Sequence, residues 1–471
     1  MKRFVFFIAF CTFIFSFKAY STTQNEPQAK YIFYFIGDGM GVNQVIGTEM
    51  YLAEIEDRIG VVPLSFTQFP ICNFATTYSG DHSITCSAAA GTALACGVKT
   101  KNGQLGVDVN GKPVESIASR FKSAGKKVGI ITSVGANHAT PAAFYAHQKS
   151  RSMYNEISRN MVASGFDLYA GGGLLKSKNT TDSTVQSIYK FLTDNSYNIV
   201  RDLPNFKSDE TGKFILLPEH EAENKSLAYA IDRKEGDITL SQFTEVAINF
   251  LSNNSPQGFF LMAEGGKIDW SCHDNDPATT FLEVIDFSEA VQKAIDFYNA
   301  HPDETLIVVT ADHETGGISL GINDYNLHLQ VLRHQKKSAE EITFEIKRLR
   351  KVRNNNVSWE EVKEVLNRNL GFWGDIKLSE LQTNSLKDIY EKTFKGDKVE
   401  MDKSLYSENE PIVTASIKLI SRMAHIGWST GKHSAGAVPV YVIGVGSQLF
   451  NGSLDNTDIP KRILKAAGKK W

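Results

Sequence analysis

Four short runs of consecutive apolar residues, rich in β-branched and aromatic side chains, recur along the chain and constrain its fold more than any other feature. The runs are 31–36, 127–132, 258–263 and 305–310, and helical patterns occupy 114–124, 151–164, 241–252 and 278–300. Runs that are apolar on both faces are typical of buried parallel strands, and their alternation with helices indicates an α/β protein. We therefore expect a doubly wound, mostly parallel sheet flanked by helices.

Polar or acidic side chains follow each of these runs within a few residues. In chain order they are Asp38, His138 with Thr140, Glu264, and the pair Asp312–His313. In open α/β sheets, ligands bind beyond the carboxyl ends of the strands. The sequence therefore predicts a functional site at this edge of the sheet.

The pattern of alternating strands and helices is interrupted between residues 326 and 423. This stretch is rich in Lys, Arg and Glu, and Ser358 with Glu361 forms a capping-box start to a short helix. The strand pattern then resumes at 438–443. We expect a mainly helical subdomain at 326–423 inserted into a catalytic domain made of 22–325 and 424–471. The charges of the insertion are typical of a solvated face.

The first 21 residues have the pattern of a secretory signal peptide. Lys2 and Arg3 precede an apolar stretch of about 14 residues, and Ala19-Tyr20-Ser21 is a small-residue cleavage pattern. This stretch is shorter than the roughly 20 residues that span a bilayer, so a stable membrane anchor is not expected. We expect a secreted protein, either periplasmic or extracellular.

The net charge argues against one class of function, whereas the cysteines leave their pairing open. A net charge of −3 argues against a nucleic-acid-binding role. Four cysteines remain beyond the signal sequence, without a CxxC pair, and leave free thiols and disulfides both open: Cys72, Cys86, Cys96 and Cys272.

Ser87 stands at the head of a run of small residues, 87–93. Thr85 offers an N-cap hydroxyl and the alanines favour a helix, so Ser87 is expected in the first helical turn. Free backbone N–H groups and the helix dipole favour an oxyanion or a phosphate there. Taken alone, however, a serine in this position is more often a cap or a packing residue.

Further acidic and imidazole side chains supply the ligand types that divalent metals need. Asp269 and His273 are four residues apart, so on a helix they share one face, as two ligands of one ion would. Asp312–His313 follows a strand, and His433 lies in a glycine-bounded loop. Three carboxylates with three imidazoles suit two zinc ions, and a further carboxylate with a hydroxyl suits magnesium.

At this point the sequence resembles the metal-dependent alkaline phosphatases, in what looks like a bacterial branch. The matching motifs are Gly37-Asp38-Gly39-Met40-Gly41, Ser87-Ala88-Ala89-Ala90-Gly91-Thr92-Ala93, His138-Ala139-Thr140-Pro141, Glu264-Gly265-Gly266-Lys267-Ile268-Asp269 with His273, and Thr310-Ala311-Asp312-His313-Glu314-Thr315-Gly316-Gly317. Their common order makes the resemblance highly specific. It runs from about residue 30 to 325 and resumes from about 425.

The resemblance implies a role for each matching residue. Ser87 is the nucleophile that becomes phosphorylated, and Arg151 grips the phosphate oxygens. The implied metal ligands are Asp269, His273 and His433 for the first zinc, Asp38, Asp312 and His313 for the second zinc, and Asp38, Thr140 and Glu264 for one magnesium. The implied reaction is hydrolysis of small phosphate monoesters to an alcohol and inorganic phosphate by a homodimer.

The chemistry needs these groups because a phosphate dianion repels an anionic nucleophile. Two zinc ions about 4 Å apart can clamp the attacking and leaving oxygens of an in-line displacement. A bound zinc also lowers the pKa of the Ser87 hydroxyl. Arg151 can hold two phosphoryl oxygens in a bidentate fork, which Lys could not copy.

The sequence departs from better-known members of the family at three positions. Cys86 replaces an Asp that anchors the phosphate-binding Arg, so we expect Arg151 to be more mobile. His138 and Trp270 stand where some bacterial members have Asp and Lys, and they are expected beside the magnesium site. The insertion resembles, in position and size, a crown or interface loop that covers the dimer interface or rims the active site.

Three alternatives remain open at the level of the sequence. A sulfatase-type hydrolase of the same superfamily is disfavoured, because Cys86-Ser87-Ala88-Ala89 lacks the Pro-x-Arg pattern of sulfatases. A phosphodiesterase would use a similar metal core. A secreted metal or phosphate binder without turnover would not need Ser87 together with Arg151.

Overall fold

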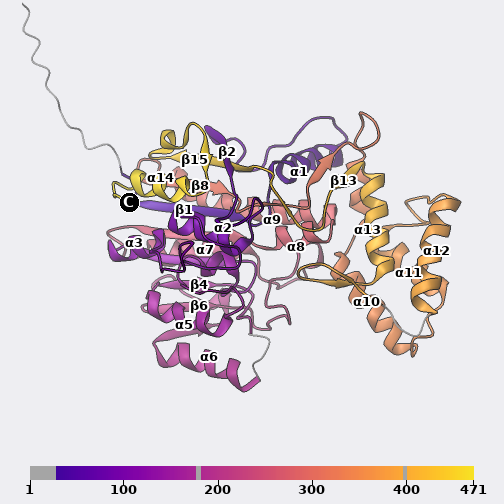
Figure 1. The fold of residues 1–471 in the computed structure, drawn as a ribbon, viewed down its shortest axis with the longest axis horizontal. Coiled ribbons are helices and arrows are strands. Elements are labelled where there is room, and N and C mark those ends of the chain that lie inside the picture. Colours follow the sequence, from indigo (N-terminus) through magenta and orange to yellow (C-terminus); the bar gives the residue numbers. More distant parts are fainter. Residues whose placement is uncertain (1–27, 177–181, 396–399) are drawn as a thin grey trace, which may run out of the picture.

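The computed structural model describes residues 28–176, 182–395 and 400–471, and the expected signal peptide lies outside them. A ten-stranded sheet forms the centre of the molecule (Figure 1). Its strands, in spatial order, are β16 (Leu454–Asp455), β2 (Ile71–Thr76), β15 (Val438–Gly444), β8 (Thr305–Thr310), β1 (Tyr31–Gly37), β7 (Phe259–Gly265), β3 (Lys127–Thr132), β4 (Leu168–Ala170), β6 (Lys213–Leu216) and β5 (Tyr197–Val200).

The sheet is mostly parallel, as the sequence predicted. Every neighbouring pair from β8 to β5 is parallel, whereas β15 runs antiparallel to both β8 and β2. The strand expected at 438–443 is therefore present, although its direction could not be read from its apolar pattern. The prediction of an α/β fold with a mostly parallel sheet is confirmed.

Helices cover both faces of this sheet (Figure 1). The four predicted helices are α3 (Ile117–Ser123), α5 (Tyr154–Ser164), α7 (Leu240–Ser252) and α9 (Pro277–Ala300). The remaining helices of this part are α1 (Val42–Ile55), α2 (Ser87–Cys96), α4 (Ala139–Ala142), α6 (Asp182–Asp194), α8 (Lys267–His273) and α14 (Asp458–Ala466). Short 3₁₀ turns are η1 (Leu203–Asn205), η2 (Ala230–Asp232), η3 (Leu329–His334) and η4 (Ser447–Phe450). Helix α3 begins three residues later than expected, because the Ser116 side chain accepts a hydrogen bond from the Ser119 N–H and caps it.

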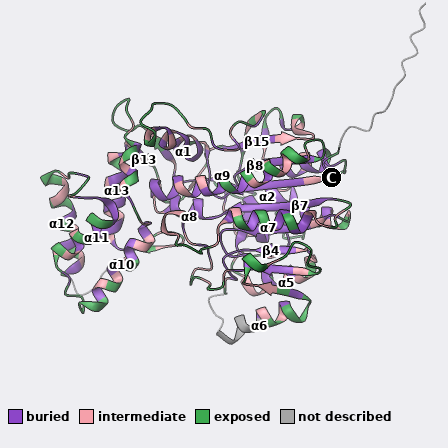
Figure 2. Ribbon diagram, turned by 180° about the vertical axis from the view of Figure 1, so that it is seen from behind, coloured by how far each residue is buried: buried purple, intermediate pink, exposed green. Residues whose placement is uncertain are grey.

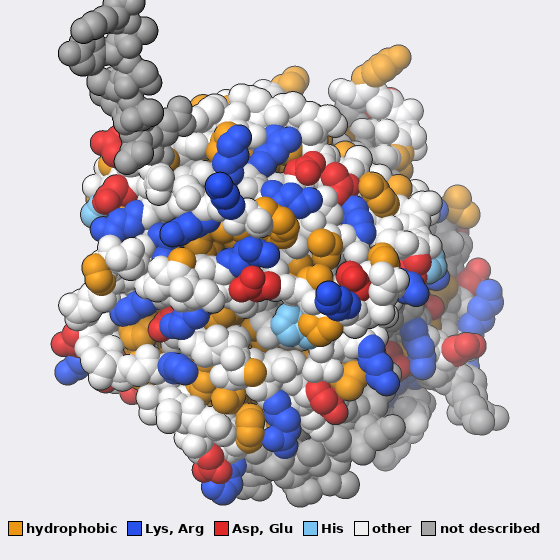
Figure 3. All heavy atoms as spheres, turned by 60° about the vertical axis from the view of Figure 1, so that its left-hand side comes forward, with side chains coloured by type: hydrophobic (Ala, Val, Ile, Leu, Met, Phe, Trp, Pro, Cys, Tyr) orange, Lys and Arg blue, Asp and Glu red, His pale blue; other side chains and the backbone are white. Residues whose placement is uncertain are grey.

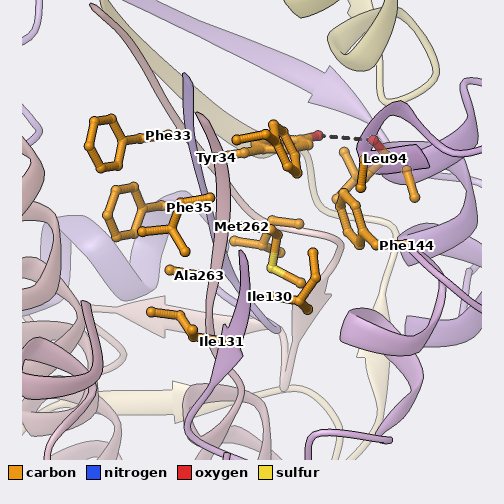
Figure 4. Close-up of a cluster of buried hydrophobic side chains, with 14 of the residues drawn as sticks. Phe33, Tyr34, Phe35, Leu94, Ile130, Ile131, Phe144, Met262 and Ala263 are labelled. Atoms are coloured by element: carbon orange, nitrogen blue, oxygen red, sulfur yellow. Dashed lines mark hydrogen bonds between the residues drawn. The ribbon is translucent and has the colours of Figure 1, made fainter. Parts of the chain in front are cut away.

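The core consists of two apolar layers, one on each face of β1 (Figures 2 and 4). Phe35 points to one face, where it meets Phe287 of α9 edge-on at 6.0 Å between ring centroids. Tyr34 points to the other face, packs on Phe144 and donates a 3.4 Å hydrogen bond to the Leu94 carbonyl of α2. These layers fix α2 against the sheet, close to the end of β1.

The inserted segment lies to one side of the sheet (Figure 1). It contains α10 (Ala339–Val352), α11 (Trp359–Leu370), α12 (Glu380–Phe394) and α13 (Pro411–Met423), with the strands β11 (Asp402–Lys403) and β12 (Glu408–Asn409). The capping box of Ser358 and Glu361 is confirmed at the start of α11. The insertion has a hydrophobic cluster of its own, which also takes in Tyr51 and Phe281 from the sheet side, so the boundaries of the subdomain stay a prediction.

Two small antiparallel pairs join the chain just before the inserted segment to the chain just after it. They are β10 (Ile318–Leu320) with β13 (Ile426–Trp428), and β9 (Glu314–Thr315) with β14 (His433–Ser434). Cys72, Cys86, Cys96 and Cys272 are all free thiols. Within the described ranges, every helix is too short or too polar to cross a bilayer.

Candidate active site

The predicted metal ligands converge at the carboxyl ends of the central strands. The structure forms three groups of donor atoms that could each hold a cation: Asp269, His273 and His433; Asp38, Asp312 and His313; and Asp38, His138 and Glu264. Residues more than 390 positions apart in sequence thus meet because parallel strands end at one edge of the sheet. Metal identity and number stay a prediction.

The first group is built on α8 and β14. Asp269 and His273 lie one turn apart on α8, with His273 Nε2 3.4 Å from Asp269 Oδ2, and His433 Nε2 lies 3.7 Å from Asp269 Oδ1. The Nδ1 atom of His273 is 2.8 Å from the Gly431 carbonyl, and that of His433 is 2.8 Å from the Thr85 carbonyl. Both Nδ1 atoms therefore carry the proton, which turns both Nε2 lone pairs toward Asp269.

The second group follows β1 and β8. His313 Nε2 lies 3.4 Å from Asp38 Oδ1 and 3.3 Å from Asp312 Oδ2. Oxygen Oδ1 of Asp312 accepts hydrogen bonds from the backbone N–H groups of Gly39 (3.1 Å) and His313 (2.9 Å). This leaves Oδ2 of Asp312 directed at the imidazole, in the position of a ligand atom.

The third group lies between β7, β3 and α4. Glu264 accepts a short hydrogen bond from Thr132 on one carboxylate oxygen, while Oε1 is buried without a partner. The predicted magnesium ligand Thr140 has its Oγ1 3.3 Å from Asp38 Oδ2. His138 was expected beside this site, and the structure places it inside the group as a further candidate donor.

The donor atoms of all three groups fit cations. Buried atoms without a hydrogen-bond partner include Asp38 Oδ1, Glu264 Oε1, Asp269 Oδ2, His273 Nε2 and His433 Nε2. A buried polar atom without a partner is destabilising, and a bound metal would satisfy each of these. The first two groups combine carboxylate oxygens with histidine nitrogens, which are donors that zinc accepts.

The pKa values of the buried carboxylates also indicate a site that binds cations. Burial, together with neighbouring carboxylates, raises the pKa of Glu264 to about 8 and that of Asp312 to about 7, and raises the pKa of Asp38 well above its usual range. Burial would also raise the pKa of Asp269, but His273 beside it holds that pKa below its ordinary value. Carboxylates crowded in this way are ionised at neutral pH only when cations accompany them.

Ser87 is the first residue of α2 and is fully buried. Its Oγ lies 3.2 Å from His313 Nε2, so the hydroxyl faces the second group of ligands. The prediction that Thr85 caps this helix is wrong: Cys86 is the N-cap, without a side-chain bond, and the Thr85 hydroxyl instead donates to the Cys86 carbonyl. The backbone N–H groups of the first turn are therefore left for an anion.

Arg151 lies just before α5, and its Nη2 donates two hydrogen bonds of 3.0 Å, to His138 Nε2 and to the hydroxyl of Tyr406. Trp270 stacks on the Tyr406 ring, with 4.8 Å between centroids and 19° between planes. Tyr406 was missed at the level of the sequence. It belongs to the polar stretch between α12 and α13, where no periodic or motif signal marks it.

A cavity of about 570 Å³ opens beside the first group of ligands. His273 and His433 lie at its base, and Thr85, Lys403 and Leu405 form part of its walls. A leaving group bound next to the first group of ligands would face this cavity. Tyr406 and the cavity walls together show that the insertion contributes to the rim of the site.

Gly39 lets the loop after β1 approach the first group of ligands. Its φ is +73°, and a Cβ at this position would lie 2.9 Å from both the Cα and the Oδ1 of Asp269. Only glycine combines this left-handed conformation with so close an approach. The Gly-Asp-Gly motif is thus explained by packing around the ligands.

Comparisons with known proteins agree with this arrangement. The sequence profile of the alkaline phosphatase family matches residues 29–469. Alkaline phosphatase 4 of Bacillus subtilis is 32% identical over 463 residues, which cover 95% of this chain and 91% of that protein. The cold-active alkaline phosphatase of Shewanella sp. superimposes with a TM-score of 0.76 at 28% identity over 93% of this chain and 99% of that one. The enzyme of Thermus thermophilus gives 0.74 at 25% identity over 98% and 96%. Because the family profile matches residues 29–469 and these relatives match most of the chain, the chain belongs to the alkaline phosphatase family and is a phosphoric monoester hydrolase.

Proposed function

We propose that the enzyme transfers the phosphoryl group of a small phosphate monoester to Ser87 and then to water, at a site with two zinc ions and one magnesium ion. The observation that carries this proposal is the position of the Ser87 hydroxyl, which lies at the N-terminus of α2 and 3.2 Å from His313 Nε2. A phosphate placed there would meet the helix N-terminus and Arg151.

Ser87 and Arg151 have different roles in the two steps of the reaction. Ser87 Oγ gives up its proton to solvent and attacks phosphorus, the P–O bond to the leaving group breaks as the phosphoserine forms, and the departing oxygen takes a proton from solvent to give the alcohol. Water then attacks the phosphoserine, which releases inorganic phosphate and returns the Ser87 hydroxyl. Arg151 donates hydrogen bonds to phosphoryl oxygens in both steps and neutralises part of their charge.

Three sets of side chains would hold the metals. They are Asp269, His273 and His433 for the first zinc, Asp38, Asp312 and His313 for the second zinc, and Asp38, Thr140 and Glu264 for magnesium. His138 lies beside the magnesium ligands, and its Nδ1 carries a proton because its Nε2 accepts the hydrogen bond from Arg151. Bound cations supply Lewis-acid stabilisation of the attacking and leaving oxygens and lower the pKa of the Ser87 hydroxyl.

A secreted homodimer is the form in which we expect the enzyme to act. The signal pattern of residues 1–21 supports export to the periplasm or the medium. A groove of about 420 Å³ between α1 and the loop at 324–327 is bordered by the fully exposed side chains of Ile59 and Tyr325, which support an interface between subunits. Light scattering of the mature protein measures the subunit number directly.

We expect no nucleic-acid-binding role for this enzyme. Over the face drawn in Figure 3, Lys and Arg side chains are interspersed with Asp and Glu. A nucleic-acid-binding role would call for a continuous basic surface instead.

Hydrolysis of p-nitrophenyl phosphate at alkaline pH tests the proposal. We expect release of p-nitrophenol that stops after chelation and returns with zinc and magnesium, and metal analysis should find two zinc ions and one magnesium ion per chain. Turnover that survives both chelation and Ser87→Ala would refute the mechanism. Faster hydrolysis of bis-p-nitrophenyl phosphate or p-nitrophenyl sulfate would show a diesterase or a sulfatase instead.

A further inference from the structure

Arg151 has no carboxylate within salt-bridge distance among the described residues 28–176, 182–395 and 400–471. Its two side-chain partners are neutral acceptors, His138 Nε2 and the Tyr406 hydroxyl, both 3.0 Å from Nη2. Because Arg151 can only donate, His138 Nε2 accepts through its lone pair, so this imidazole is uncharged. The arginine is thus oriented by two hydrogen bonds that leave its full positive charge uncompensated.

Tyr406 itself is held firmly. Its ring stacks on Trp270 on one side, and its centroid lies 5.7 Å from that of His138 and 5.5 Å from that of His273. The tip of its hairpin is closed by a hydrogen bond between the backbones of Ser404 and Ser407, and Ser407 Oγ donates to Asp274 at 2.6 Å. The phenol oxygen therefore has a defined position relative to the site.

We propose that Tyr406, which lies in the inserted segment, is the positioning residue for the phosphate-binding Arg151. The phenol oxygen accepts one hydrogen of Nη2 and directs the guanidinium, while the hydrogens on Nε and Nη1 stay available to phosphoryl oxygens. This inference rests on the proposed function, in which Arg151 binds the phosphate. The phenol oxygen fixes the direction of the guanidinium by accepting one hydrogen bond, and it carries no charge of its own.

Tyr406→Phe separates this role from packing, because phenylalanine keeps the ring on Trp270 and removes only the hydroxyl. We expect KM for p-nitrophenyl phosphate and the inhibition constant Ki for inorganic phosphate to rise together, by about 3- to 10-fold, the range for loss of one ordinary hydrogen bond, because Arg151 keeps its bond to His138. The value of kcat should change less than twofold. The melting temperature of the holoenzyme should stay within the spread of the control below.

Tyr390→Phe is the matched control. Tyr390 also lies in the insertion, on α12, and its hydroxyl donates a 2.8 Å hydrogen bond to the Val357 carbonyl, away from the active site. This variant loses a comparable hydroxyl, so its melting temperature reports the structural cost alone. Its KM and Ki should equal those of the wild-type enzyme.

Cys86→Asp in the Tyr406→Phe background tests whether the effect passes through the arginine. Cys86 is the N-cap residue before Ser87, and a carboxylate there would give Arg151 a new anchor. We expect Ki for phosphate to return to the wild-type value or below it. Weaker phosphate binding without recovery would mean that the Tyr406 hydroxyl acts directly on phosphate, and would overturn the positioning role.

The outcomes distinguish this inference from the proposed function. An inactive metal-loaded wild-type enzyme would reject the function itself. An active wild-type enzyme whose Tyr406→Phe variant has unchanged KM and Ki would reject only the role of Tyr406.

Discussion

Among single residues, Ser87 has the clearest expected phenotype. Its hydroxyl is buried at the N-terminus of α2 and faces His313. Ser87→Ala should reduce kcat/KM by at least about 10³-fold, since losing the nucleophile of a covalent mechanism removes the whole pathway. Zinc and magnesium contents, measured by elemental analysis, should remain as in the wild-type enzyme. Turnover within tenfold of the wild type would show that another group attacks phosphorus.

Gly39 illustrates how a residue without a side chain can control metal binding. Gly39→Ala would place a methyl group 2.9 Å from the Cα of Asp269 and force a left-handed alanine. We expect displacement of Asp269, fewer than two zinc ions per chain, and activity at least about tenfold lower.

The matched control for this variant is Gly111→Ala. Gly111 also has a positive φ, +79°, but a Cβ there would meet no atom within 4 Å. This variant therefore carries the backbone strain of about 1 kcal/mol without the collision. A zinc content that falls equally in both variants would show that strain, and not contact with Asp269, is responsible.

At the scale of secondary-structure elements, the insertion depends on a buried ion pair between α10 and the start of α13. Arg350 donates from Nε and Nη2 to both carboxylate oxygens of Glu410, at 2.8 and 3.0 Å, and both residues are buried. Arg350→Met should lower the stability to urea by about 3–5 kcal/mol, because it leaves a buried carboxylate unpaired. Lys363→Met breaks the exposed pair with Glu360 and should cost less than about 1 kcal/mol. Equal effects of the two variants would contradict this account.

The elements of the central sheet could be predicted well, because local patterns encode them. Runs of apolar residues identified the strands, and helical periodicity identified α3, α5, α7 and α9. The helix cap at Thr85 was predicted wrongly, since the choice between two neighbouring cap positions depends on the approach of the chain and not on the hydroxyl alone. The antiparallel direction of β15 depends on the path of the preceding chain, which apolar composition does not record.

At the scale of the whole molecule, metal binding should determine how stability depends on pH. The raised pKa values of Glu264 and Asp312, about 8 and 7, mean that the metal-free folded state binds protons more tightly than the unfolded state. The stability that these groups contribute is complete below the unfolded value near 4 and is lost as pH rises toward the folded values. Between pH 7 and 8 the free energy of unfolding of the chelated protein should fall by about 1 kcal/mol through Glu264 and by less than about 0.5 kcal/mol through Asp312.

Two comparisons check this expectation by urea unfolding. Zinc with magnesium should stabilise the protein more at pH 8 than at pH 7, because the ligands bind cations as carboxylates. Metal-free Glu264→Gln should lose its share of the slope, since an amide does not titrate in this range. A slope unchanged by that substitution would assign the pH dependence to other groups.

The active site divides into a part that the sequence predicts and a part that only the folded molecule reveals. Asp38, Glu264 and Asp312 follow strands, and sheets of this class gather such residues at one edge. The hydrogen bond between Arg151 and Tyr406 joins residues that are 255 positions apart in sequence. Such a contact has no local signature, because it follows from how the insertion rests against the sheet.

Through Tyr406, the inserted segment takes part in phosphate binding as well as in the shape of the molecule. Insertions are the portions of a fold that lineages exchange most freely, and here any exchange would also reset how strongly the enzyme retains its product. A shortened enzyme that lacks 326–423 would therefore release phosphate readily and capture dilute substrate poorly. The affinity of the enzyme for dilute substrate and for its product could therefore change with the inserted segment, while the metal ligands, which lie outside it, stay the same.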